Sequence, residues 1–417
     1  MIDDGVDMTT FGYLEIASPL HDGATVARIA ATLRPRLEQI GGQPVTAPDE
    51  RLDQPLVILV ATGGTERQVL DALHRRHDVV PFEPALLVAH PLHNSLPAAL
   101  EALARVHADG ERGRIVQLGP GSPAQLADAI ADVVVVHRMH ATRLGVVGEP
   151  SPWLVASVPD DELIRARWGI EVVPVDIGST IDGHRHADAD RTQAVAVHFA
   201  GAAPPTPALV EAAKLHPSLV DAIESADVDA VTVRCFDYLD ELQTSGCIAL
   251  AQLNDTGIVA GCEGDVASAV AMLLVRALLD QPSWMANPAW IDVDHDRVML
   301  AHCTIAPSLV EDVTLHTHFE SGLGVGLRGR FADGPVTLIR LGGSALERCW
   351  IADGHVEHVP EIDDLCRTQV AVQLTGASVE ELLDAPLGNH LVLVRGHHRQ
   401  RIERWWRSAF STPAREG

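Results

Sequence analysis

Short apolar runs alternate with segments of helical spacing over the first part of the chain. Residues 55–62 are almost entirely apolar and are followed by a glycine pair and an amphipathic segment at 66–76. Residues 84–90 form another apolar run, which leads into the helical spacing of 95–110, and residues 113–119 repeat the strand pattern. Buried strands that alternate with helices are typical of a doubly wound parallel sheet.

A second region of this kind begins near residue 143. Residues 143–148 and 170–177 are strand-like, whereas residues 208–226 have apolar positions at helical spacing. The segments 229–236 and 247–255 are also predicted to be strands. The pattern therefore predicts a second α/β domain with its own parallel sheet.

The loop after these segments contains Cys262, Glu263 and Gly264, and an apolar helix is predicted to begin after Asp265. Ligand sites in open α/β sheets gather at the carboxyl ends of the strands. We therefore expect this loop to belong to a functional site.

From about residue 298 the pattern changes to short alternating runs separated by Gly, Asp and Pro, which is typical of an antiparallel barrel or sandwich. The sequence thus predicts an α/β fold, with two doubly wound parallel-sheet domains followed by a β-rich, barrel-like C-terminal domain. The expected domains are residues 1–142, residues 143–297 with the Glu263 loop, and residues 298–417.

The composition restricts the functional classes. Lys and Arg total 31 against 57 Asp and Glu, and the resulting net charge of −26 argues against a nucleic-acid partner. The most apolar run, residues 266–279, is too short to span a membrane, and the acidic start of the chain lacks the features of a signal peptide. The six cysteines show no CxxC spacing, so we expect a cytoplasmic protein with reduced thiols.

Two acids lie at the predicted start of the apolar helix. Asp265 is expected to be its N-cap, because an Asp at that position accepts hydrogen bonds from free backbone N–H groups. Glu263 lies outside the helix and next to a glycine. Two interpretations of Glu263 remain open: a solvated loop acid, or a carboxylate aimed into a cleft as a metal ligand or general base.

The chain has 21 histidines, so most of them must be structural. His302 is expected at the end of a strand, His316 and His318 on one face of a strand, and His390 at the start of a strand. With Glu263, such imidazoles form a mixed oxygen and nitrogen set that suits Mn²⁺ or a similar divalent ion. The spacings of tight Zn²⁺ sites do not occur in the sequence.

An ordered series of segments resembles the fucose isomerase and arabinose isomerase superfamily, most closely its shorter prokaryotic members. The segments between residues 143 and 396 are RLGVVGEPSPWLVAS, TVRCFD, LAQLNDTGIVAGCEGD, MANPAWIDVDHDRVMLAHCTIAP, LHTHFESG, CRTQV and GNHLVLVRG. The resemblance implies two α/β domains followed by a β-rich domain. It also implies a Mn²⁺-dependent aldose–ketose isomerase that assembles as a homo-oligomer, a hexamer or a related form.

The resemblance further implies a set of site residues. Glu263 matches the first acidic ligand of the superfamily, His390 its C-terminal histidine, and His302 an additional histidine of the arabinose branch. The second acidic ligand would fall at Asn287, which is an uncharged amide, and Asn287 is therefore added to the expected ligands. The resemblance makes Glu263 and Asn287 the catalytic candidates. The candidate substrate-binding residues in the matching segments are Trp153, His318, Arg367 and Asn389.

An isomerase of this kind removes a proton next to a carbonyl group and returns it one carbon away through an enediolate, with Glu263 as metal ligand and acid–base group. Three alternatives stay open. The substrate is an anionic sugar such as sulfoquinovose, or the scaffold performs another sugar reaction as an epimerase or lyase, or the chain binds a sugar without catalysis.

Overall fold

The computed structural model describes residues 10–119 and 122–410. The first nine residues, which belong to the acidic start that is predicted not to be a signal peptide, lie outside the described part. The chain divides into two compact units, Met1–His140 with Arg401–Gly417 and Ala141–Gln400. The three-domain division stays a prediction, since compactness alone does not separate the sheet and the barrel of the larger unit.

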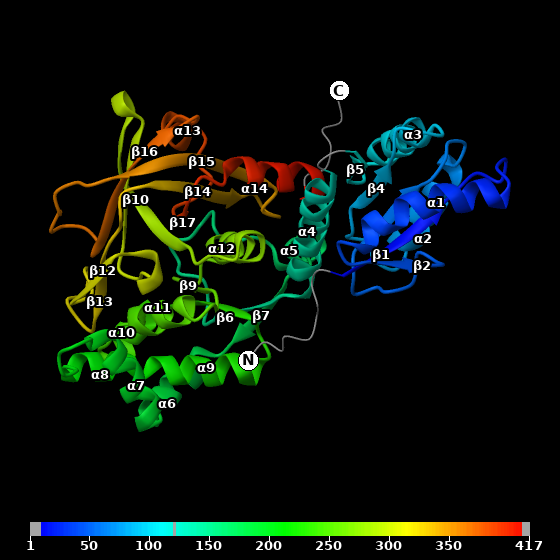
Figure 1. Cartoon of the computed structure of the whole chain (residues 1–417). Helices are drawn as coiled ribbons and strands as arrows, with labels where there is room; N and C mark the ends of the chain where they lie inside the picture. Colours follow the sequence, from blue (N-terminus) through cyan, green and yellow to red (C-terminus); the bar gives the residue numbers. More distant parts are fainter. Residues whose placement is uncertain (1–9, 120–121, 411–417) are drawn as a thin grey trace. The chain divides into compact units, whose positions relative to one another are not determined.

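The first unit is built on a five-stranded parallel sheet with the strand order β2-β1-β3-β4-β5 (Figure 1). The helices α1 and α4 cover one face of this sheet and α2 and α3 cover the other, which explains why the strands are apolar on both faces. Its elements are β1 (Phe11–Ile16), α1 (Gly23–Glu38), β2 (Gly42–Val45), β3 (Leu56–Val60), α2 (Glu66–His77), β4 (Ala85–Ala89), α3 (Ser95–Ala108), β5 (Gly113–Gln117), α4 (Ser122–Ala141), α14 (Arg399–Trp405) and η3 (Trp406–Phe410).

The second unit begins with a four-stranded parallel sheet of the order β7-β6-β8-β9. Its last helix, α12, packs against β8 and β9 and also against β14 and β17, so it joins this sheet to the barrel (Figure 1). The elements are β6 (Arg143–Val147), α5 (Asp161–Trp168), β7 (Glu171–Val175), α6 (Ile177–Arg185), α7 (Ala189–Ala200), α8 (Pro207–Ala213), α9 (Leu215–Ala226), β8 (Ala230–Val233), α10 (Phe236–Leu242), α11 (Cys247–Asp255), β9 (Ala260–Cys262) and α12 (Val266–Leu279).

The rest of the second unit contains a closed antiparallel barrel with the strand order β10-β11-β16-β15-β14-β17. A separate two-stranded antiparallel sheet is formed by β12 and β13. Strand β10 pairs with β17 through its first residues and with β11 through the remainder. The elements are β10 (Trp284–Asp292), η1 (Val293–His295), β11 (Arg297–His302), η2 (Pro307–Leu309), β12 (Asp312–His316), β13 (Gly326–Arg330), β14 (Pro335–Gly342), β15 (Arg348–Glu357), β16 (Thr368–Thr375), α13 (Glu380–Asp384) and β17 (Leu391–Arg395).

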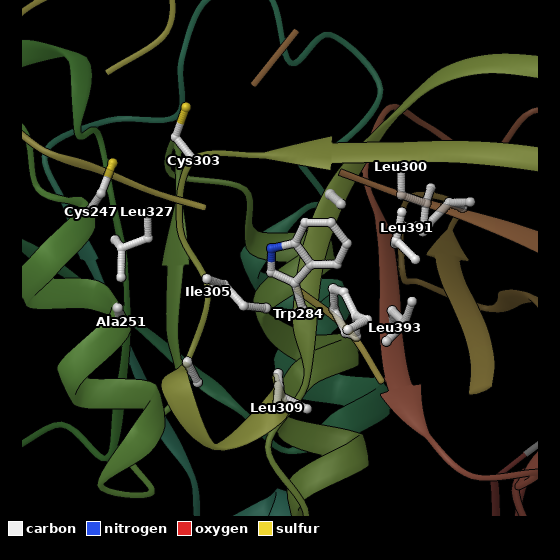
Figure 2. Close-up of a cluster of buried hydrophobic side chains, with 14 of the residues drawn as sticks. Cys247, Ala251, Trp284, Leu300, Cys303, Ile305, Leu309, Leu327, Leu391 and Leu393 are labelled. Carbon is white, nitrogen blue, oxygen red and sulfur yellow. The ribbon is translucent and has the colours of Figure 1, made fainter. Parts of the chain in front are cut away.

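The core of the barrel is filled by the apolar residues of alternate strand positions. Figure 2 shows the indole of Trp284, on β10, among Leu300 of β11 and Leu391 and Leu393 of β17, the two strands that pair with β10. The indole Nε1 of Trp284 donates a hydrogen bond to the carbonyl of Thr304 at 2.5 Å, so the one polar atom of this ring is satisfied. The predicted fold class, parallel α/β sheets followed by a β-rich barrel, is confirmed.

Two local predictions are wrong. Residues 247–255 were expected to be a strand, but they form the helix α11, of which six residues are buried. An apolar run that is buried on most sides carries no periodicity that separates strand from helix. His318 was expected to share a strand face with His316, but β12 ends at His316 and His318 lies in the segment that follows.

Among the described residues, no helix has both the length and the hydropathy needed to cross a bilayer.

Candidate functional site

The turn between β9 and α12 has a specialised backbone. Glu263 has a φ of 64° and Gly264 a φ of 69°, so two successive residues occupy the left-handed region, which is uncommon for a glutamate. The carbonyl of Glu263 accepts a hydrogen bond from the backbone N–H of Ser151 at 2.8 Å. A Cβ on Gly264 would lie 2.8 Å from Pro150 Cα and 2.9 Å from Glu149 O. The turn is therefore held tightly against the loop that follows β6.

This packing predicts a large cost for a side chain at position 264. We expect Gly264→Ala to lower the free energy of unfolding by more than the roughly 1–3 kcal/mol that a left-handed non-glycine residue costs, because the backbone of Pro150 must also move. Gly322→Ala is the matched control, since Gly322 has a φ of 68° and no neighbour within 4 Å of the place that a Cβ would take. Urea unfolding measures both variants, and equal losses would contradict the packing argument.

Three predicted residues meet at the end of this turn. Glu263 follows β9, His302 is the last residue of β11, and His390 immediately precedes β17. One ligand atom from each of them lies within 4.8 Å of those of the other two, and all three side chains are buried. Nε2 of His390 is 3.4 Å from Oε1 of Glu263. Residues from a parallel sheet and from two barrel strands thus converge on one point.

Asp265 has two functions in this arrangement. Its carboxylate accepts hydrogen bonds from the backbone N–H and the hydroxyl of Ser268, both at 2.8 Å, so the predicted N-cap of α12 is confirmed. The same carboxylate lies 2.8 Å from Nδ1 of His390 and has no solvent exposure. A carboxylate on Nδ1 fixes the ring orientation of a histidine and directs Nε2 towards the site.

Arg340 extends this network beyond Asp265. Its guanidinium is buried, lies 3.6 Å from the carboxylate of Asp265, and donates to the hydroxyls of Ser268 at 3.0 Å and Ser157 at 2.5 Å. It also donates to the backbone carbonyl of His390 at 3.1 Å. Arg340 therefore compensates a buried carboxylate and holds the backbone next to the histidine at the same time.

The electrostatics of the site favour a cation. Burial raises the pKa of Glu263, but nearby His390 and His302 and the hydrogen bond from Trp153 outweigh it, so its pKa lies below the usual value. Burial and then the charge of His390 lower the pKa of His302 to about 3. Burial also lowers the pKa of His390, but Asp265 and Glu263 together raise it to about 9. The two carboxylates stay ionised and stabilise positive charge between them.

An aromatic wall, formed by Trp153, Phe236 and His318, borders the site. The indole Nε1 of Trp153 donates to Oε2 of Glu263 at 2.6 Å. The ring of Trp153 meets Phe236 edge to face at a centroid distance of 5.1 Å, and Phe236 meets His318 in the same way at 5.7 Å. Aromatic surfaces next to polar groups suit a sugar ring, which has both apolar C–H faces and hydroxyls.

The other predicted site residues lie at different places. Asn287 pairs with Ala301 across β10 and β11, so strand alternation sends its side chain to the face opposite to that of His302. Met285, two positions earlier on the same face as Asn287, accepts a hydrogen bond from the backbone N–H of Cys262 at 3.1 Å, so this face lies towards the β9 turn and Asn287 stays a predicted ligand. Asn389 lines a cavity of about 460 Å³ together with Trp290 and Trp350.

Several residues of the site were missed in the sequence. The contact between Asp265 and His390 joins residues 125 positions apart, and no spacing indicates it. Arg340 did leave a signal, because it is the one charged residue in the otherwise apolar strand β14. Phe236 left none, since an aromatic residue after a strand is usually part of a core.

Comparisons with known proteins point to sugar isomerases. No family model matches the sequence. The chain is similar to proteins named sulfoquinovose isomerase from Priestia aryabhattai, at 23% identity over 279 residues, and from Clostridium sp. (strain MSTE9), at 26% identity over 240 residues. The Priestia match covers 63% of this chain and 61% of the relative, and the Clostridium match covers 51% and 53%. A relative of the same name from Alkalicoccus urumqiensis is 21% identical over 276 residues.

Proposed function

We propose that the chain is a metal-dependent aldose–ketose isomerase that acts on sulfoquinovose or a closely similar sugar. The observation that carries this proposal is the buried cluster of Glu263, His302 and His390, in a chain whose relatives are named as isomerases of that sugar. The aromatic wall beside Glu263 supports a sugar as the substrate.

The donor set fits a divalent ion such as Mn²⁺. Nε2 of His390 is buried and has no hydrogen-bond partner among the described residues. The two carboxylates next to His390 favour a positive charge at this position. His302 is already neutral at physiological pH, whereas His390, with a pKa of about 9, would have to release a proton when a metal binds. One carboxylate and two imidazoles leave positions open for sugar oxygens. We therefore propose Glu263, His302 and His390 as ligands of the ion.

The residues of the site have different roles in the proposed reaction. A bound divalent ion would supply Lewis-acid stabilisation of the negative charge that develops on the sugar oxygens. Glu263 has one oxygen towards His390 and one towards Trp153, and its carboxylate is the proposed acid–base group that takes the proton from the carbon next to the carbonyl. The aromatic wall orients the sugar, while Asp265 and Arg340 hold His390 in place.

One assay tests the function and separates it from the alternatives. The purified protein, loaded with Mn²⁺, is incubated with sulfoquinovose in D₂O and followed by NMR. A ketose product with deuterium at the carbon next to the carbonyl supports the isomerase. A sugar epimerised at that carbon identifies an epimerase, cleavage products identify a lyase, and binding without reaction identifies a sugar-binding protein.

Trp153 provides a prediction for the orientation of Glu263. Trp153→Phe keeps an aromatic ring against Phe236 but removes the N–H donated to Oε2 of Glu263. A hydrogen bond to a charged group is worth about 1.5–3 kcal/mol. Since Trp153 is 50% exposed, we expect the lower end of this range, roughly a tenfold loss of kcat.

Trp350→Phe is the matched control, because Trp350 donates in the same way to Glu381 at 2.8 Å on the barrel surface. Steady-state kinetics of both variants should show a loss for Trp153→Phe alone. Unchanged kcat in Trp153→Phe would mean that its indole does not orient Glu263.

A further inference from the structure

Arg367 is fixed next to the candidate site. It directly precedes β16, in which Thr368 pairs with His302. Its Nε donates to the carbonyl of Thr317 at 2.8 Å and its Nη2 to the hydroxyl of Thr317 at 3.3 Å. The guanidinium also lies 5.7 Å from the ring centroid of Phe319. The residues on either side of His318 therefore anchor this arginine.

The charge of Arg367 is not compensated by a carboxylate. Arg328 and Arg330, on the neighbouring strand β13, form ion pairs with Glu361 and Glu311. Among residues 10–119 and 122–410, Arg367 forms no ion pair, and its Nη1 makes no hydrogen bond. In a chain with a net charge of −26, a half-buried and immobilised arginine without an acidic partner has its free donors available for an anion from outside.

The aromatic wall connects Arg367 to Glu263. The three rings follow one another from the carboxylate of Glu263 to His318, which lies between the two residues that contact Arg367. Burial lowers the pKa of His318, the positive charge of Arg367 lowers it further, and the carboxylate of Glu263 opposes both. His318 is thus within electrostatic reach of the arginine and of the candidate metal site.

We propose that Arg367 binds the anionic group of the sugar substrate, a sulfonate or a phosphate, while the carbonyl end of the same sugar lies at Glu263, His302 and His390. This inference rests on the proposed function. The planar guanidinium offers two parallel N–H groups to two oxygens of such an anion, and the aromatic wall covers the sugar ring between its two ends. Arg367 then selects an anionic over a neutral sugar.

The test compares sugars that differ only at the sixth carbon: sulfoquinovose, glucose 6-phosphate and uncharged 6-deoxyglucose. For Arg367→Gln we expect kcat/KM with the anionic sugar to fall roughly 10- to 100-fold, mainly through KM, and the value for 6-deoxyglucose to stay unchanged. Arg367→Lys should show a smaller loss than Arg367→Gln, because Lys keeps the positive charge but lacks the paired N–H donors. Arg330→Gln is the matched control, since its side chain is exposed and paired with Glu311.

Calorimetric titration of each sugar into the same proteins separates this inference from the proposed function. Binding of an anionic sugar that depends on Arg367 but leads to no turnover supports the anion site and contradicts the isomerase. Isomerisation of sulfoquinovose that is equally fast in the Arg367→Gln variant contradicts the anion site and leaves the isomerase intact. Equal losses for neutral and anionic sugars, or no binding of either anionic sugar to the unchanged protein, also overturn the inference. Preference for the phosphate or the sulfonate identifies the anion.

Discussion

We expect Glu263→Gln to lower kcat by roughly 10²- to 10⁴-fold, the range associated with the loss of a positioned general acid or base. The same change should remove most of the bound Mn²⁺, because Glu263 is the single carboxylate among the three buried groups that face one another. Gln has nearly the same shape, so the hydrogen bond from Trp153 can persist while the charge is lost. Metal analysis after dialysis and steady-state kinetics measure the two effects.

The control for this prediction is Glu320→Gln. Burial raises the pKa of Glu320, and the carboxylate of Glu263 raises it further, so Glu320 shares the local field without belonging to the proposed ligands. We expect the Glu320→Gln variant to retain its metal. Retention of full metal occupancy and turnover by Glu263→Gln, with circular dichroism unchanged, would refute the assignment of Glu263.

The second large effect is expected at Asp265. Asn caps a helix about as well as Asp, so Asp265→Asn should keep the cap of α12. It leaves the buried guanidinium of Arg340 without its compensating charge, so we expect the free energy of unfolding to fall by roughly 3–5 kcal/mol. It also removes the negative charge that lies 2.8 Å from Nδ1 of His390. Loss of the partner that orients a metal-binding histidine typically weakens metal affinity about 10- to 100-fold. Titration of the metal-free protein with Mn²⁺ measures the loss of affinity, and urea unfolding measures the loss of stability.

Two further variants define the comparison. Asp265→Ala loses the cap as well and should be less stable than Asp265→Asn by about 0.5–2 kcal/mol. Asp188→Asn is the matched control, because Asp188 caps α7 through the N–H of Arg191 at 2.7 Å and lies at an exposed position. If Asp265→Asn binds Mn²⁺ as tightly as the unchanged protein, Asp265 is a cap alone and the network through Arg340 has no functional role.

The parts of the fold that follow from local patterns could be predicted from the sequence. Apolar runs with turn residues between them located β3 to β8 and the barrel strands after residue 298, because burial on one or two faces leaves a period in the sequence. Strands β1, β2, β9 and β10 were not predicted. The strand ends at His302 and His390 and the corner at Glu263 were found in the same way. The prediction of a strand at 247–255 was wrong because this segment is buried on most sides, which removes the hydrophobic period that separates a helix from a strand.

The rest of the candidate site depends on contacts that no local pattern encodes. Asp265 was identified by its position before a helix, and this was sufficient for the cap but not for its contact with His390. The assignment of Asn287 came from the spacing of a resemblance and stays a prediction, because spacing alone does not show which groups a side chain contacts. Arg367 was predicted as a substrate-binding residue from its segment, but only the structure shows that it lacks the acidic partner that Arg328 and Arg330 have.

The closure of the barrel has a consequence for biosynthesis. Strand β17 is the last strand of the barrel and lies between β10 and β14, so the barrel is open until this segment has left the ribosome. His390 directly precedes β17 and is made 125 residues after Asp265, when the sheet and α12 can already have folded. Metal would therefore be acquired after folding rather than serve as a template for it. A nascent chain stalled before residue 390 should contain its folded parallel sheets without binding Mn²⁺. The amount of Mn²⁺ in the growth medium should not change how these sheets form.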